Sequence, residues 1–128
     1  MTVSASGFHH VAIKARDVEG LATFYTDVVG LALMRTFRDD AGVRSLWLTC
    51  GPAILMIERS EIGGRGDHDF AADPPGVHLV AFAVTARERQ RLRAHLLKAG
   101  VALASETDHT LYVQDPEGNR LGFSSWPD

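Results

Sequence analysis

The sequence predicts an α+β fold of two tandem βαβββ modules. Three observations predict it. A strand, a helix and three further strands follow one another twice along the 128 residues. The two halves match residue by residue, because residues 11–13 (VAI) correspond to residues 80–82 (VAF) at an offset of 69. Each predicted helix also ends at a glycine, Gly30 or Gly100. We therefore expect module one at 7–60, a linker at 61–76 and module two at 77–126.

The first module begins with residues 8–15, whose β-branched and apolar side chains favour a strand. Asp17 stands at the N-cap of a helix that ends at Gly30. The apolar residues of that helix are at helical spacing: Leu21, Phe24, Tyr25 and Val28. Three strands follow, at 31–37, 43–50 and 53–59, and turn residues separate them.

The second module repeats this order. Residues 78–84 favour a strand, and Thr85 with Glu88 forms a capping box that opens a helix. The apolar stripe of this helix is Leu92, Leu96 and Ala99. Three strands complete the module, at 101–104, 110–114 and 120–124, with a turn at 115–119.

Composition excludes several classes of function. Apolar residues make up 45% of the chain and charged residues 23%, as in an ordinary globular domain. The net charge of −3 provides no basic surface for nucleic acid or an anionic membrane. Cys50 is the only cysteine, so the chain has no intrachain disulfide. With no apolar run of membrane-spanning length and no signal-peptide pattern, we expect a cytoplasmic protein.

Three segments resemble the signatures of one family. Residues 10–17 (H-V-A-I-x-x-x-D) and 24–31 (FYTDVVGL) resemble the first-module signature of the vicinal oxygen chelate superfamily. Residues 115–119 (D-P-E-G-N) resemble its second signature, before the final strand. This superfamily includes glyoxalase I, bleomycin- and fosfomycin-resistance proteins and extradiol dioxygenases. The resemblance covers almost the whole chain. It implies that the paired modules form a curved mixed sheet around a cavity, and that the protein is a homodimer.

In metal-dependent branches of that family, the first and last strands of each module hold a divalent ion. His10 stands at the first of these four positions. Side chains alternate along a strand, so Val11 and Ile13 are expected to face the helix and His10, Ala12 and Lys14 the opposite side. The repeat alignment places Leu79, Leu55 and Gly122 at the other three positions, and none of them is a metal ligand. A single imidazole does not hold a catalytic ion, since such sites need about three protein ligands. The resemblance therefore implies a member that lacks the usual metal ligands.

The expected cavity suits an organic ligand. Its predicted lining residues are Trp47, Leu55, Leu79, Ala81, Ala83, Tyr112, Gln114, Gly122 and Ser124. Trp47 and Tyr112 occupy matching places in the two modules, as ring-stacking partners or as ordinary core residues. His10 is the candidate catalytic or orienting residue, acting as a base or as a hydrogen-bonding group. Alternatively, His10 has no function, and backbone or water satisfies its ring.

The leading prediction is metal-independent binding or sequestration of a small organic molecule, with no cofactor. The alternative is a metal-dependent glyoxalase-like lyase or extradiol-type dioxygenase. It would use His10, Glu58 and His78, with β-bulges that redirect Glu58 and His78, to hold iron, manganese, nickel or zinc. Residues 63–69 are interpreted as a solvated linker, although the inter-module loop of this family can act as a lid.

Overall fold

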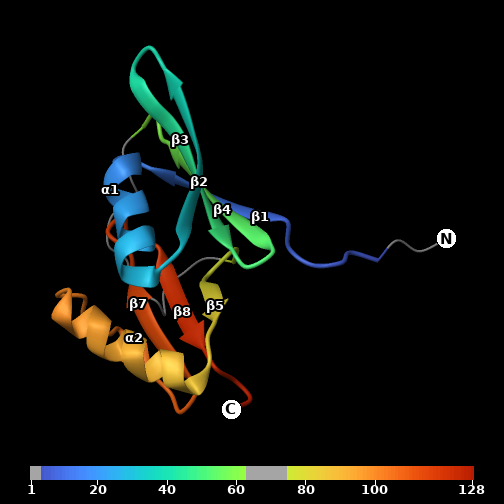
Figure 1. The fold of residues 1–128 in the computed structure, drawn as a ribbon, viewed down its shortest axis with the longest axis vertical. Helices are drawn as coiled ribbons and strands as arrows, with labels where there is room; N and C mark the ends of the chain where they lie inside the picture. Colours follow the sequence, from blue (N-terminus) through green and yellow to red (C-terminus); the bar gives the residue numbers. More distant parts are fainter. Residues whose placement is uncertain (1–3, 63–74) are drawn as a thin grey trace. The chain divides into compact units, whose positions relative to one another are not determined.

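The computed structural model describes residues 4–62 and 75–128. The chain divides into two compact units, residues 1–64 and 65–128, and each is described by itself (Figure 1). Each unit contains one four-stranded sheet and its helix, so the predicted α+β class is confirmed. The predicted linker residues 63–74 lie outside the described part of the chain.

The first unit has the predicted order of elements. They are β1 (His10–Ala15), α1 (Val18–Thr23), the π-helix η1 (Phe24–Val29), β2 (Ala32–Asp39), β3 (Gly42–Cys50) and β4 (Ala53–Arg59). The strand order in the sheet is β1-β4-β3-β2, with β1 parallel to β4 and the other pairs antiparallel.

The second unit repeats that topology. Its elements are β5 (Val80–Ala83), α2 (Ala86–Lys98), β6 (Ser105–Glu106), β7 (Thr110–Gln114) and β8 (Arg120–Ser124). The strand order is β5-β8-β7-β6, and β5 is parallel to β8. Because both sheets have the same order and directions, the repeat seen in the sequence is a repeat of βαβββ units.

The helix of the first unit differs from the single α-helix that its spacing predicts. Asp17 caps it, since its Oδ1 accepts a hydrogen bond from the Gly20 N–H at 2.9 Å. After Thr23 the backbone widens into a π-helix that ends at Gly30, whose φ is +90°. The wider turn allows two consecutive aromatic residues, Phe24 and Tyr25, to be buried together, with ring centroids 5.3 Å apart.

The capping box predicted for α2 is present. The Glu88 N–H donates to Thr85 Oγ1 at 3.0 Å, and the Thr85 N–H donates to Glu88 Oε2 at 2.8 Å. Gly100 follows the helix with φ +78°, the left-handed conformation that ends many helices. In Figure 1, α2 runs beside β7 and β8.

Each sheet packs one face against its own helix. The apolar residues that this packing buries on the strands of the first unit are Leu46, Leu48, Leu55 and Ile57. On the strands of the second they are Leu111, Val113, Leu121 and Phe123. Side chains alternate between the two faces of a strand, so the residues between these positions lie on the face opposite the helix.

Some predicted strand limits need correction. Residues 101–104 are not a strand, and β6 is instead formed by Ser105 and Glu106, which pair with Tyr112 and Leu111. The strand predicted at 78–84 is shorter and begins at Val80. No helix in the described part of the chain is long and apolar enough to cross a membrane.

Candidate functional site

The candidate site begins on the face of the first sheet opposite α1. On β1, Val11 and Ile13 are half-buried, whereas His10, Ala12 and Lys14 between them are exposed. This alternation was predicted from the sequence and is confirmed. His10 therefore lies on the face opposite α1.

Strand pairing sets the neighbours of His10 on that face, in three rows that cross the sheet from β2 to β1. The rows are Ala32–Thr49–Ile54–His10, Arg35–Trp47–Met56–Ala12 and Phe37–Ser45–Glu58–Lys14. The middle row is apolar and aromatic except for Arg35, and the first row has His10 as its only titratable residue. The sequence alone does not identify Arg35, Phe37 or Met56 as site residues, because only the pairing of the strands places them beside Trp47.

Trp47 has defined contacts on this face. Its indole Nε1–H donates to Ser45 Oγ at 3.0 Å. Its ring lies 5.0 Å from the ring of Phe37, centroid to centroid, at an interplanar angle of 52°. Because its N–H already has an acceptor, Trp47 offers a ligand mainly its ring surface.

His10 contacts its neighbour in the sequence. The Nδ1 atoms of His9 and His10 are 3.0 Å apart, and the two rings meet edge to face. In this hydrogen bond one ring donates and the other accepts, so the bond fixes the orientation of both rings. The Nε2 atom of His10 takes no part in it.

The corresponding face of the second sheet surrounds Gly122. Gly122 pairs with Ala81 on β5 and with Tyr112 on β7, so the three residues share a face. A Cβ atom at Gly122 would lie 3.4 Å from Tyr112 Cε1 and from Thr110 Cγ2, and 3.5 Å from Ala81 Cβ. These are ordinary van der Waals distances, so a small side chain fits there.

The other predicted residues of the second unit occupy related positions. Gln114 pairs with Arg120 and lies on the same face as Tyr112. Ser124 lies there too, but its Oγ accepts hydrogen bonds from Thr110 Oγ1 at 2.8 Å and from the Trp126 N–H at 3.2 Å. Leu79 is half-buried just before β5, and Ala83 is exposed at its end.

The predicted position of Leu55 needs correction. Leu55 pairs with Val11 and is buried on the face that packs against α1. The residue that corresponds to Gly122 is Met56, because Met56 pairs with Trp47 as Gly122 pairs with Tyr112. The repeat alignment treated the β3–β4 turn as two residues shorter than the β7–β8 turn. The strand pairings show that it is one residue shorter. A shift of one residue along a strand moves a side chain to the opposite face.

The two alternative metal ligands are placed differently from expectation. Glu58 lies on the same face as His10 without any β-bulge, since the β1–β4 and β3–β4 pairings are continuous. It is four residues beyond Ile54, the partner of His10, and therefore about 13 Å along the strand. His78 is exposed, and its Nδ1 accepts a hydrogen bond from Arg120 Nη1 at 3.0 Å.

Within residues 4–62 and 75–128, no three His, Cys, Asp or Glu side chains are close enough together to hold a metal ion. Cys50 is half-buried, and this burial raises the pKa of its thiol. A raised pKa favours the protonated thiol, which is less reactive than the thiolate.

The D-P-E-G-N segment is a structural turn. Asp115 is buried, and its Oδ1 accepts hydrogen bonds from the N–H groups of Glu117 and Asn119, both at 2.9 Å. Its Oδ2 accepts a third from Asn119 Nδ2 at 2.8 Å, and Gly118 has φ +85°. The motif thus fixes the entry into β8, and with it the position of Gly122.

A family model agrees with these features. Residues 7–123 match the model described as the Glyoxalase/Bleomycin resistance protein/Dioxygenase superfamily. The chain belongs to this superfamily. The resemblance noted in the sequence to vicinal oxygen chelate proteins is thereby confirmed.

Solved structures of superfamily proteins share the fold. A glyoxalase/dioxygenase from Nostoc punctiforme has a TM-score of 0.77 at 17% identity, covering 96% of this chain and 95% of its own. Lactoylglutathione lyase from Agrobacterium tumefaciens scores 0.72 at 19% identity, with 97% and 98% covered. The fosfomycin resistance protein FosX from Mesorhizobium loti scores 0.73 at 13% identity, with 95% and 93% covered. A search of curated proteins found no matching sequence.

This superfamily member also has a polar cavity of about 460 Å³ beside α2. It is lined by Arg89, Gln90, Arg93, Glu106, Thr107, Asp108 and Leu111. Arg93 contacts Glu106 through Nε and Nη2, both at 3.2 Å, and Arg89 donates to the Asp108 carbonyl oxygen. The Arg93 hydrogen bond holds the pKa of the Glu106 carboxyl below its usual value. Because the arginines of this cavity are already hydrogen-bonded to its other lining residues, the cavity is a weaker candidate for a ligand site than the sheet faces.

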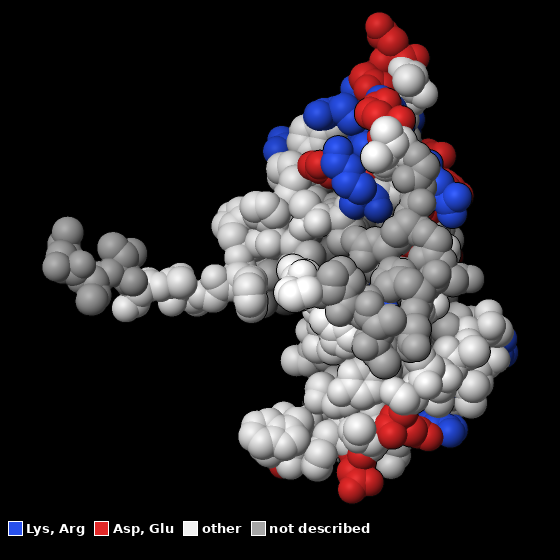
Figure 2. Space-filling model, turned by 180° about the vertical axis from the view of Figure 1, so that it is seen from behind, with Lys and Arg blue, Asp and Glu red and all other residues white. Residues whose placement is uncertain are grey.

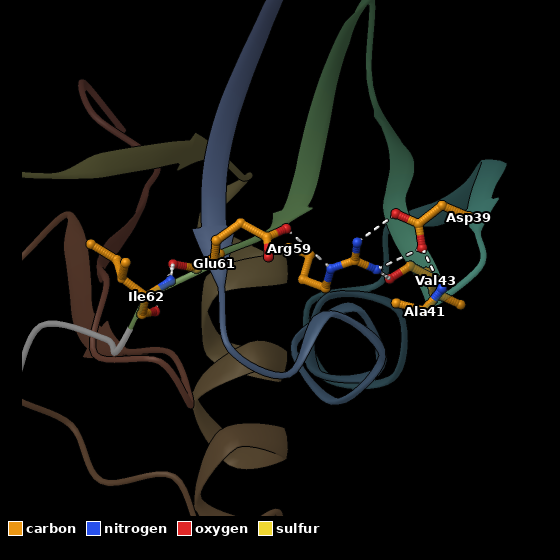
Figure 3. A network of polar contacts seen from close by, with 7 residues as sticks. Asp39, Ala41, Val43, Arg59, Glu61 and Ile62 are labelled. Carbon is orange, nitrogen blue, oxygen red and sulfur yellow. Dashed lines mark hydrogen bonds and ion pairs between the residues drawn. The ribbon is translucent and has the colours of Figure 1, made fainter.

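A second charged group lies at the hairpin end of β2 and β3. Arg59 donates from Nη2 to Asp39 Oδ2 at 2.5 Å and from Nη1 to Asp39 Oδ1 at 3.1 Å (Figure 3). Arg59 Nη1 also donates to the Val43 carbonyl oxygen, and Nε lies 3.5 Å from Glu61 Oε1. The Arg59 hydrogen bond lowers the pKa of Asp39. Figure 2 shows basic and acidic side chains gathered at this end of the hairpin.

Proposed function

We propose that this superfamily member binds a small organic molecule without a resident metal ion, on the sheet face opposite α1. His10 is the polar group that orients the ligand, and Trp47 and Met56 provide its apolar contact surface. The observation that carries the proposal is the pairing register. In that register, a row that is apolar and aromatic except for Arg35 lies directly beside the row that contains His10. An apolar surface with a few convergent polar groups is typical of organic ligand sites.

The donor groups on the two faces do not fit a resident divalent ion. On β4, the residues next to His10 are Ile54 and Met56, neither of which provides a hard oxygen or imidazole ligand. Gly122, at the corresponding place on β8, has no side chain. A catalytic ion needs about three protein ligands, and the first sheet supplies only His10 at this level.

The chemistry of His10 follows from its contacts. Its Nδ1 is engaged with His9, and its Nε2 is left to meet a ligand. A neutral imidazole can donate or accept one hydrogen bond there, according to its tautomer. His10 would thereby orient a ligand hydroxyl or carbonyl, or remove a proton from it.

Ligand binding after metal removal tests this proposal. The protein would be treated with EDTA and screened by thermal shift against small organic molecules, and hits measured by calorimetry. We expect binding to survive EDTA and to weaken about tenfold in His10→Gln, which removes the imidazole. His95→Gln, an exposed histidine of α2, is the matched control and should leave the affinity unchanged. Binding that disappears with EDTA and returns with added metal would overturn the proposal.

A metal-dependent lyase or extradiol-type dioxygenase is the second candidate, because Glu58 shares the face of His10 without a bulge. Two observations weigh against it. Glu58 lies about 13 Å along the strand from the partner of His10. His78 accepts from Arg120 through Nδ1, so as a neutral ring it carries its proton on Nε2 and has no lone pair left for a metal. Turnover of a hydroxyacid or a catechol that disappears with a chelator, and returns with iron, manganese, nickel or zinc, would favour this candidate.

A further inference from the structure

The outer strands of the first sheet carry a group of cationic and aromatic side chains. We call Arg35, Phe37, Arg44 and Trp47 the β2–β3 cluster. The guanidinium carbon of Arg35 lies 5.6 Å from the ring centroid of Phe37, and that of Arg44 lies 5.8 Å from it. Trp47 contacts the same ring. Two guanidinium groups and two aromatic rings are therefore concentrated on one pair of strands.

Among the described residues, no carboxylate is ion-paired with an arginine of this cluster. Within the described residues, neither Arg35 nor Arg44 forms an ion pair or a side-chain hydrogen bond. Asp39 is near enough to Arg44 to feel its charge, but its carboxylate is already held by Arg59. Both arginine side chains are exposed, whereas the two rings are half-buried. The cluster thus combines a fixed aromatic surface with two guanidinium groups that remain available.

These features together define a ligand chemistry. A planar ring stacks on Trp47, because offset stacking adds to the gain from apolar burial. The fork of a guanidinium matches a carboxylate, with which it forms two parallel charge-assisted hydrogen bonds. Arg35 and Trp47 are paired across β2 and β3, so a ring placed over Trp47 has its substituent next to Arg35. A neutral ring would leave this guanidinium without an anion.

We infer that the ligand of this face is an aromatic anion, namely an aryl carboxylate, with its ring on Trp47 and its carboxylate on Arg35 and Arg44. The inference rests on the function proposed above and specifies the chemical class of the ligand. It assigns Arg35 and Arg44 as specificity-determining residues, whereas His10 contacts another part of the molecule.

Fluorescence of Trp47 provides the test. Trp126, the other tryptophan, is 73% exposed, and Trp126→Phe leaves Trp47 as the only tryptophan emitter. The probes are 4-nitrobenzoate and its neutral isostere 4-nitrobenzamide, because the nitroaryl ring of each quenches indole emission on contact. We expect saturable quenching by the carboxylate at a concentration about tenfold lower than by the amide. The double variant Arg35→Gln/Arg44→Gln should lose this preference and still bind the amide.

The matched control is Arg87→Gln/Arg91→Gln, which removes two exposed arginines of α2 and the same net charge. It should keep the preference for the carboxylate. Circular dichroism of each variant establishes that it is folded. Equal quenching by both probes, a preference that survives the Arg35/Arg44 change, or no saturable quenching would overturn the inference. The first two results leave the proposed function intact, and that proposal is judged separately by EDTA-resistant binding and its dependence on His10.

Discussion

The two units share a topology but differ in the faces that do not contact their helices. On the helix side, Leu46 and Leu48 of the first unit correspond to Leu111 and Val113 of the second, and all four are buried. On the opposite side, Trp47 and Tyr112 are both aromatic, but Met56 is matched by Gly122. The helix-facing positions are apolar in both units because they form the cores. The opposite faces do not form these cores, and it is there that the two units differ.

The largest expected effect contrasts the two faces of one strand. Leu48 has no exposed surface and packs on the α1 side, whereas Thr49 is exposed on the opposite side. Leu48→Ala should lower the free energy of unfolding by about 2–5 kcal/mol, because it leaves a cavity. Thr49→Ala should change it by about 0.5 kcal/mol or less. Denaturant unfolding measures both, and equal losses would contradict the assignment of faces.

The next largest change in unfolding free energy is expected at the turn before β8, in comparison with the turn before β4. Asp115→Ala removes a buried acceptor of three hydrogen bonds and should cost about 1.5–3 kcal/mol. Cys50 stands at the corresponding place in the first unit, and Cys50→Ala should cost about 1 kcal/mol or less. Thermal unfolding of the two variants compares them. A larger loss for Cys50→Ala would show that the D-P-E-G-N turn is not what fixes β8.

Much of this comparison could be predicted from the sequence. Helical spacing, capping residues and the repeat gave both βαβββ units, and alternation placed His10 on the correct face. Leu55 was placed wrongly, because the length of a turn does not show which residues pair across it. Arg35 was missed because the β2–β3 register shifts between Leu33 and Arg35, and such a shift leaves no mark in the sequence. The π-helix was also missed, since its apolar spacing resembles that of an α-helix.

A smaller effect sharpens the role of Gly122. Gly122→Ala should change the unfolding free energy by about 1 kcal/mol or less, because the new Cβ atom makes only ordinary contacts on a regular strand. Gly118 is the control, since its φ of +85° disfavours any side chain. Gly118→Ala should cost about 1–2 kcal/mol. The reverse order, measured by thermal unfolding, would place Gly122 on the α2 side of the sheet.

The smallest effect concerns acid, and it compares one surface ion pair from each unit. Arg59 lowers the pKa of Asp39, so this pair stabilises the fold above the unfolded pKa of about 3.9. That contribution disappears as the pH falls through the lower folded pKa. Arg93 lowers the pKa of Glu106 in the same sense, with an unfolded pKa of about 4.3. Asp39→Asn and Glu106→Gln should each be less stable than wild type at pH 7.

Unfolding curves recorded from pH 7 down to pH 2 test this. For both variants, the gap in stability from wild type should close as the pH falls below about 4. A gap that stays constant, or one that widens in acid, would contradict the assigned ion pairs. High salt should also narrow the gap at neutral pH, since both pairs are at the surface.

Native mass spectrometry of the purified protein and of His10→Gln, recorded with parallel metal analysis, tests metal-independent binding most directly. We expect the wild-type chain to hold no stoichiometric divalent ion and to acquire the mass of an added organic ligand after EDTA treatment. His10→Gln should show a smaller fraction of that bound mass. One tightly held divalent ion per wild-type chain, lost in His10→Gln, would contradict metal-independent binding and establish His10 as a metal ligand.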